Sequence, residues 1–147
     1  MKILIAEDEF TTRRLLQTYL EKWGHEVTAA KTGLEALQLF EQGDYAMVVT
    51  DWSMPEMDGL ELIGRIRALP RADSVYIVLV TARSQAEDVV EGIEAGADDF
   101  VTKPFDRDEL RARMRAGERI VTSLRTITEL RAQLQNALER LGQTQDT

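Results

Sequence analysis

Five short apolar runs alternate with longer amphipathic patterns along the 147-residue sequence. The β-branched and apolar composition of the short runs predicts buried strands over residues 2–6, 26–30, 45–50, 75–80 and 98–101. Between them, apolar residues recur at helical spacing and predict helices over residues 11–23, 33–43, 59–69 and 84–96. Strands that alternate with helices indicate a parallel sheet covered by helices on both faces, with right-handed crossovers. The expected fold class is therefore α/β.

Capping residues predict where two of the later helices begin. Ser84 is the expected cap of the fourth helix, and Asp106 of the final one. The final helix is expected to be much longer than a compact domain needs, because residues 108–141 contain no proline and only one glycine, Gly117.

Apolar residues in the second half of this final helix follow a repeating four-then-three spacing. Arg131 takes the one polar position in the seam, whose members are Ile120, Leu124, Ile127, Arg131, Leu134, Leu138 and Leu141. Three heptads of this kind indicate a coiled coil, in which a single polar residue can set register and oligomeric state. We therefore expect a domain over residues 1–120, a coiled-coil signalling helix with a polar tail over residues 121–147, and a homodimer formed through residues 118–141.

The composition narrows the classes of partner and compartment. With 18 basic and 26 acidic residues the net charge is −8, which argues against a nucleic-acid surface, since phosphate backbones select basic stripes. The absence of cysteine excludes disulfides, thiol catalysis and thiolate metal sites. The sequence starts directly in a strand-like run and contains no apolar run near the roughly 18 residues of a membrane helix. We expect a cytoplasmic protein with no membrane partner.

Polar side chains lie at the carboxyl ends of four of the predicted strands. Glu7 and Asp8 follow the first strand, Asp51 ends the third, Thr81 ends the fourth and Lys103 follows the fifth. The carboxyl ends of parallel strands meet at one edge of the sheet, where open α/β sheets bind ligands. A carboxylate is too costly to desolvate deeper in the sheet, so Asp51 is expected at this rim.

These residue types suit magnesium-assisted phosphoryl transfer. Asp8 and Asp51, with Glu7 reaching through water, would repel one another unless a hard divalent cation such as Mg²⁺ neutralised them. A metal beside Asp51 also neutralises charge on an incoming phosphoryl group. Lys103 supplies a movable point charge for the same oxygens, and Thr81 supplies a hydroxyl donor. Asp51 is therefore the candidate reactive residue of the site.

The same residues give the sequence a resemblance to the receiver domains of two-component response regulators, over about residues 1–120. The matching motifs are Ile3-Leu4-Ile5-Ala6-Glu7-Asp8, Asp51 with Met54-Pro55-Glu56-Met57-Asp58-Gly59, Thr81-Ala82, Gly96-Ala97-Asp98-Asp99-Phe100 and Lys103-Pro104-Phe105. The resemblance implies a flavodoxin-like, doubly wound sheet with strand order 2-1-3-4-5, in which the first and third strands are neighbours. That order would bring Asp8 beside Asp51.

The resemblance also implies the chemistry of the site. Asp51 would accept a phosphoryl group from the phosphohistidine of a histidine kinase or phosphotransfer protein. Mg²⁺ would be held by Asp8, Asp51 and the backbone carbonyl of Ser53, with Glu7 acting through water. Such a domain is not an enzyme acting on other substrates, since only self-phosphotransfer and autodephosphorylation are expected.

Three further residues acquire roles from the same resemblance. Thr81 and Lys103 would contact the phosphoryl oxygens, and Phe100 would be the aromatic residue that changes rotamer on activation. The resemblance also implies a cis bond between Lys103 and Pro104. The expected outcome is a conformational switch.

Different uses of such a switch stay open. The leading hypothesis is an input module whose final helix dimerises and controls an output domain outside this sequence. The alternative is a stand-alone adaptor whose coiled coil binds a partner protein. A magnesium-dependent phosphatase of the haloacid dehalogenase kind is disfavoured, because Ser53 stands where such enzymes place a second aspartate. A degenerate receiver is disfavoured because all the site residues are present.

Several other residues receive structural interpretations. His25, the single histidine, is expected at the surface and not in phosphate relay. Met54 and Met57 are expected to position the loop after Asp51, and Trp52 is either a partial lid over Asp51 or an exposed loop aromatic. The arginines of the last helix are expected to form a solvated face paired with its acids, with a docking role as the minor reading: Arg107, Arg111, Arg113, Arg115 and Arg119, with Asp108, Glu109 and Glu118.

Overall fold

The computed structural model describes residues 1–145, so the last two residues of the predicted polar tail lie outside the described residues. Strands and helices alternate as the sequence predicts. In chain order the elements are β1 (Lys2–Ala6), α1 (Phe10–Lys22), β2 (Glu26–Ala30), α2 (Gly33–Gln42), β3 (Met47–Asp51), α3 (Gly59–Arg67), the short 3₁₀ helix η1 (Ala72–Ser74), β4 (Tyr76–Thr81), α4 (Ala86–Ala95), β5 (Asp99–Thr102) and α5 (Arg107–Gln145).

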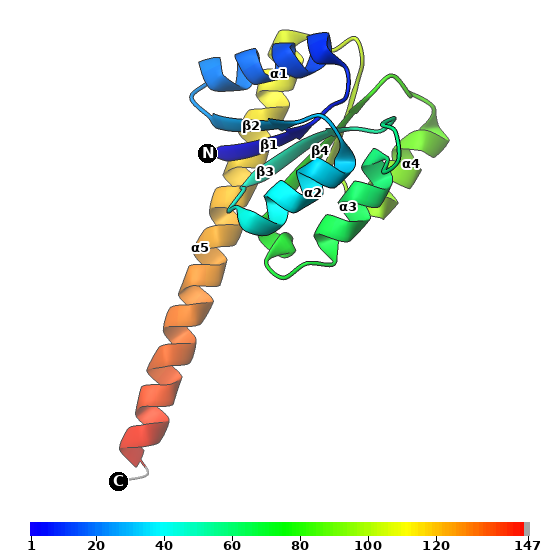
Figure 1. Ribbon diagram of the computed structural model, residues 1–147. Helices are drawn as coiled ribbons and strands as arrows, with labels where there is room; N and C mark the ends of the chain where they lie inside the picture. The colour runs from blue at the N-terminus through cyan, green and yellow to red at the C-terminus, as the bar shows by residue number, and fades with distance from the viewer. Residues whose placement is uncertain (146–147) are drawn as a thin grey trace.

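The five strands form one parallel sheet in the order β2-β1-β3-β4-β5, which confirms the predicted topology. The order reverses direction between β1 and β3, and these strands lie side by side at the centre of the sheet (Figure 1). Their register aligns Ala6 with Thr50, so Glu7 and Asp51 leave the two strands at the same height. The register therefore already positions part of the candidate site.

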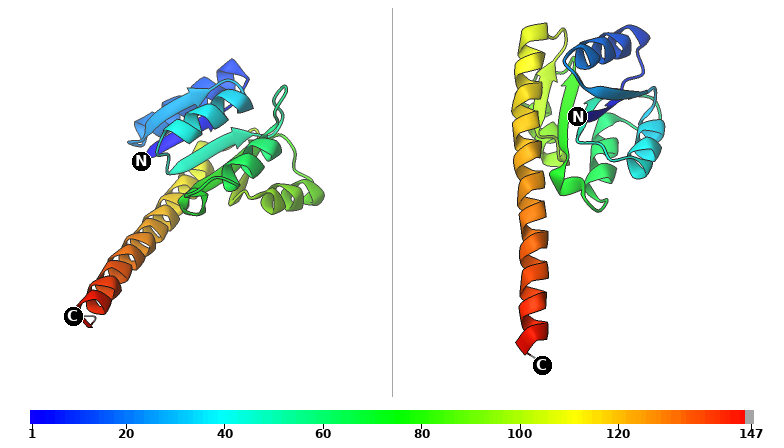
Figure 2. Two further views of the ribbon diagram at one scale, coloured as in Figure 1. Left: turned by 60° about the horizontal axis from the view of Figure 1, so that its bottom comes forward. Right: turned by 90° about the vertical axis from the view of Figure 1, so that its left-hand side faces the viewer.

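Alternate side chains of the strands enter two separate cores, one on each face of the sheet. In β1, Leu4 packs with α2 and α3, while Ile3 and Ile5 pack with α1 and α5. The helices α2, α3 and α4 thus cover one face, and α1 and α5 cover the other (Figures 1 and 2). All five residues of β3 are buried, as expected for a central strand of a doubly wound sheet.

Helix α5 is 39 residues long, about 58 Å at 1.5 Å per residue. Its first turns pack on the sheet through Leu110, Met114 and Val121, and it then continues well past the body (Figure 2). After Val121 none of the side chains described up to Gln143 is buried. The predicted seam is therefore largely exposed in the single chain, with Leu134, Leu138 and Leu141 each 56–60% accessible.

The capping predictions have different outcomes. Asp106 caps α5 as expected, because its Oδ1 accepts the backbone N–H of Asp108 at 2.7 Å. The prediction for Ser84 is wrong, since α4 is capped one residue later by Gln85. A capping box explains the shift: the carboxylate of Asp88 accepts the N–H of Gln85 at 3.3 Å, and the Gln85 side chain caps the N–H of Asp88 in return.

The arginine-rich face of α5 is partly paired within the helix and partly with the body. Arg113 contacts Glu109 at 3.2 Å, as predicted, and also Asp99 of β5 at 2.8 Å. The expected pairing of Glu118 with an arginine is wrong, because Glu118 binds His25 at 3.0 Å.

Among the described residues, no helix combines the length and the apolar composition that crossing a membrane requires.

His25 is buried, which corrects the expectation of a surface residue. Its Nε2 lies 3.0 Å from Glu118 of α5, and its Nδ1 lies 3.3 Å from the amino group of Met1. Those partners suit a neutral ring that donates from Nε2 and accepts at Nδ1. Burial lowers the pKa of His25, although the negative charge of Glu118 opposes this effect.

We expect the imidazole of His25 to titrate below its ordinary pKa of 6.5. The folded state then binds this proton less tightly than the unfolded chain, so the contribution of His25 to stability is complete above the ordinary pKa and declines as the pH falls through it. An NMR titration reports this midpoint without ambiguity, because the chain has one histidine. Glu118→Gln should lower the midpoint further, and a parent midpoint above 6.5 contradicts the assignment.

Candidate functional site

The predicted site residues converge at the carboxyl edge of the sheet. Glu7 and Asp8 follow β1, Asp51 ends β3, Thr81 ends β4 and Lys103 follows β5. Because β1 and β3 are neighbours, carboxylate oxygens of Glu7, Asp8 and Asp51 all lie within 4.8 Å of one another. The structure therefore brings together the three acidic residues that the sequence analysis predicted to form the site.

Lys103 is the cation of this cluster. Its Nζ lies 2.9 Å from Glu7 Oε1 and 3.3 Å from Asp51 Oδ2. The other oxygen of Asp51, Oδ1, accepts the backbone N–H of Trp52 at 2.7 Å. Asp51 is thus held at both oxygens, and its side chain stays at the rim of the sheet, only 11% accessible.

Burial and like charge set the protonation of the cluster. Burial raises the pKa of Glu7 to about 8, the carboxylate of Asp51 adds to the rise, and Lys103 opposes it. Burial alone would lower the pKa of Lys103, but its hydrogen bond to Glu7 and the two nearby carboxylates outweigh burial and raise it. Near neutral pH Glu7 therefore retains a proton, and a bound divalent cation would replace that proton and neutralise the carboxylates.

The donor set fits a hard divalent cation. Among the described residues, Glu7 Oε2 is the one buried side-chain nitrogen or oxygen without a hydrogen-bond partner. A buried polar atom without a partner is costly, and a bound water or ion would satisfy it. Carboxylate oxygens with room for waters are the ligands that Mg²⁺ prefers. Ser53 lies exposed in the loop after β3, and the role of its carbonyl stays a prediction.

The loop from β3 to α3 is held close to Asp51. The N–H of Gly59 donates to the carbonyl of Trp52 at 2.7 Å, and a Cβ on Gly59 would collide with the carbonyl oxygen of Asp51. Met54 and Met57 are buried in the core under the loop, as expected for residues that position it. This loop can therefore close tightly over the end of β3 only with glycine at position 59.

Trp52 is 4% accessible, so its interpretation as an exposed loop aromatic is wrong. Its ring meets Phe100 edge to face at 6.4 Å, and the guanidinium of Arg83 lies 4.4 Å from its centroid. The backbone N–H of Arg83 also donates a hydrogen bond to the hydroxyl of Thr81 at 3.2 Å. Two strand residues, Thr81 and Phe100, and two loop residues, Trp52 and Arg83, thus form one chain of contacts beside Asp51, which the sequence did not indicate.

Three other observations concern residues at the edge of the site. Arg13 of α1 donates to the backbone carbonyls of Glu7 at 3.0 Å and Asp8 at 3.3 Å, and no sequence signal pointed to it. The bond between Lys103 and Pro104 is cis, as the resemblance implied. Phe100 is half-buried beside α4.

A family model, the response regulator receiver domain, matches residues 3–115. The chain belongs to this family. It is 43% identical over 118 residues to the uncharacterized transcriptional regulatory protein YkoG of Bacillus subtilis, which covers 80% of this chain and 50% of YkoG. The chain therefore spans about half the length of this curated relative.

Solved receiver structures share the fold of this domain. A receiver domain of a Francisella response regulator matches with a TM-score of 0.74 at 32% identity, over 84% of this chain and 98% of that one. The response regulator TrrA of Thermotoga maritima, solved in complex with Mg²⁺ and BeF, matches with a TM-score of 0.71 at 36% identity, over 79% and 97% of the two chains. TrrA is thus a receiver of similar fold whose solved structure contains Mg²⁺ and BeF.

Replacing Asp51 with Asn should stabilise the metal-free receiver domain. Asn Oδ1 can still accept the Trp52 N–H, and Lys103 keeps Glu7 as its partner. Because the pKa of Glu7 rises from 4.5 to about 8 on folding, the metal-free domain loses stability as the pH rises through that interval. At pH ~8 without divalent cations we expect Asp51→Asn to add roughly 1 kcal/mol to the free energy of unfolding, the scale of one pKa unit.

Urea denaturation at several pH values measures this effect. Asp51→Asn should also flatten the decline in stability between acidic and alkaline pH. Glu41→Gln removes an exposed carboxylate far from the cluster and should match the parent. A variant of Asp51 that is less stable than the parent at alkaline pH without cations would show that the cluster is not under like-charge repulsion.

Proposed function

We propose that this receiver domain is the phosphoacceptor of a two-component signalling pathway, with Asp51 receiving the phosphoryl group from a histidine kinase or phosphotransfer protein. In that step the P–N bond of the donor phosphohistidine breaks, a P–O bond to an Asp51 carboxylate oxygen forms, and the histidine recovers a proton. The observation that carries the proposal is the position of Asp51, fixed at the sheet rim between two acidic side chains and one lysine.

Mg²⁺ would be held by Asp8, Asp51 and the Ser53 carbonyl, with Glu7 acting through water. The unpartnered oxygen of Glu7 and the close carboxylates support this assignment. When bound there, the cation would offset negative charge on the phosphoryl oxygens and on the cluster. The side chains around it position the reacting groups.

Lys103 is placed to follow the phosphoryl oxygens, because its ammonium already contacts Asp51 at 3.3 Å and sits on a flexible stem. The hydroxyl of Thr81 accepts an N–H from Arg83, and it can donate its own proton to a phosphoryl oxygen. Any movement of Thr81 toward that oxygen changes its contact with Arg83. The guanidinium of Arg83 packs on Trp52, and Trp52 packs on Phe100. We assign Phe100 the role of the switching aromatic on this basis.

The domain acts on itself and not on other substrates. Its expected reactions are self-phosphotransfer and hydrolysis of its own acyl phosphate. Ser53 stands two residues after Asp51, where a general acid for other phosphate esters would be needed. The proposed role is therefore regulatory.

The output of the switch is proposed to pass through α5. Its exposed seam supports a homodimer over residues 118–141 that controls an output domain outside this chain. Regulators such as YkoG are named as transcriptional, but the acidic net charge of −8 makes nucleic acid an unsuitable direct partner for these residues. The same seam supports the second candidate, an adaptor whose coiled coil binds another protein.

Phosphorylation is tested with a small acyl phosphate donor and intact-protein mass spectrometry. We expect one phosphoryl group per chain, dependent on Mg²⁺, labile to hydroxylamine, and absent from Asp51→Asn. His25→Gln should be labelled as well as the parent, since His25 is buried away from the site against Glu118. Labelling that survives Asp51→Asn, or that needs His25, would refute Asp51 as the acceptor.

A further inference from the structure

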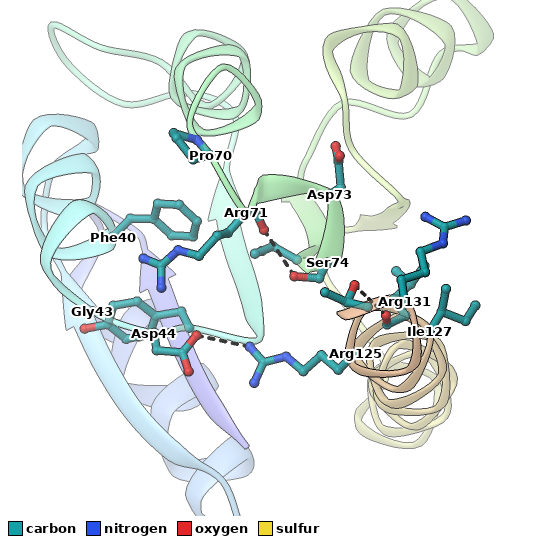
Figure 3. Close-up of a pocket in the computed structure, with 14 residues that line it drawn as sticks. Phe40, Gly43, Asp44, Pro70, Arg71, Asp73, Ser74, Arg125, Ile127 and Arg131 are labelled. Carbon is teal, nitrogen blue, oxygen red and sulfur yellow. Dashed lines mark hydrogen bonds and ion pairs between the residues drawn. The ribbon is translucent and has the colours of Figure 1, made fainter. Parts of the chain in front are cut away.

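A groove of about 530 Å³ separates α5 from the body (Figure 3). It lies at the edge of the sheet opposite the acidic cluster, because its lining residues Tyr45 and Val75 precede β3 and β4. One wall is the part of α5 that leaves the domain, including Ile127 and Arg131.

The other wall is formed by the segment between α3 and β4, including Asp73 of η1, and by the end of α2 with the residues that precede β3. Among the latter, Asp44 pairs with Arg125 of α5 at 3.4 Å. The apolar seam of α5 therefore runs along the mouth of this groove.

Two opposite charges on this groove are unpaired in the single chain. Arg131 and Asp73 are both exposed, and neither forms an ion pair with any residue that the structure describes. The helix offers Arg131 no acid either, because its neighbours three and four residues away are Ile127, Thr128, Leu134 and Gln135. Arg131 thus has no ion-pair partner among the described residues, at the one position where the seam is polar.

A coiled coil alone would not satisfy this charge. The positions that flank the seam are occupied by uncharged residues, namely Val121, Ser123, Thr128, Leu130, Gln135 and Ala137. Partner choice in coiled coils usually depends on charges at these flanking positions, which are missing here. When two such helices pair, Arg131 must turn out of the apolar seam to avoid an uncompensated buried charge. Arg131 lines the same groove as Asp73.

We propose that a second copy of this chain closes the groove: its α5 lies along the exposed seam, and its Arg131 pairs with Asp73. The inference rests on the proposed dimer and adds a contact between the coiled coil and the body. The seam and groove are continuous, since Leu124 and Ile127 belong to both. Two-fold symmetry gives two such pairs in each dimer. The contact would fix the direction of α5 relative to both receiver bodies.

Mixing two charge-reversed chains tests the pairing. Asp73→Arg and Arg131→Asp should each weaken self-association roughly tenfold, because both symmetry-related pairs become repulsive. A mixture of the two chains should form heterodimers in preference to either homodimer, since every Asp73–Arg131 pair across the interface is then attractive. Native mass spectrometry of chains with different tags measures the species directly.

The controls separate this contact from the dimer itself. Glu129→Arg reverses a charge on α5 outside the seam and should show no preference in the same mixture. Leu138→Asp places a charge in the seam and should abolish association. If the pair instead forms within one chain, each variant keeps its repulsion and no heterodimer preference appears, which overturns the inference while leaving a seam-dependent dimer intact. A parent protein that stays monomeric overturns both the dimer and the groove contact.

Discussion

The crowding of three carboxylates at the end of two neighbouring strands is the constraint on which the rest of this receiver depends. Desolvated like charges oppose folding unless they are neutralised. The sheet order places β1 beside β3 and so creates the crowding, while Lys103 relieves part of it by contacts to Glu7 and Asp51. Burial raises the pKa of Glu7 to about 8, the neighbouring Asp51 adds to the rise, and Lys103 offsets only part of it. A domain with this residual repulsion is sensitive to any ligand that changes the local charge.

The contacts beside the cluster connect this charge to the long helix. Arg83 links the Thr81 hydroxyl to Trp52, and Trp52 packs on Phe100 of β5. The residue before Phe100, Asp99, forms an ion pair at 2.8 Å with Arg113 of α5. A displacement of β5 would therefore act on a helix that is anchored in the core and projects beyond it. This geometry makes α5 the element through which the proposed signal leaves the domain.

The strands and the positions of the site residues could be predicted because short-range chemistry determines them. Continuous apolar runs identified the strands, and the polar residue at each strand end had to lie on the same edge of a parallel sheet. The role of Met54 and Met57 in positioning the loop also followed from the loop sequence, whereas the steric requirement for Gly59 appeared only in the structure. Helix ends were less reliable, as Gln85 in place of Ser84 shows, because a capping box depends on which side chains meet.

Other features depend on contacts between residues that are far apart in the sequence, and a local sequence pattern does not reveal those contacts. His25 is buried because α5 brings Glu118 over it, and those residues lie 93 positions apart in the sequence, as the numbering shows. Trp52 was left open between lid and exposed aromatic because its packing needs both Phe100 and Arg83. The groove beside α5 could not be foreseen either, since η1 and the projecting helix enclose it together.

A divalent cation that completes the acidic cluster should stabilise the folded domain, and the most direct measurement of this is unfolding with and without Mg²⁺. Because binding to the folded state alone adds stability, Mg²⁺ at about 100 times its dissociation constant should raise the free energy of unfolding by about 2.7 kcal/mol. The gain should disappear in Asp8→Asn, which keeps the fold but removes a ligand. An equal gain in the parent and in Asp8→Asn, or no gain in the parent, would contradict the account.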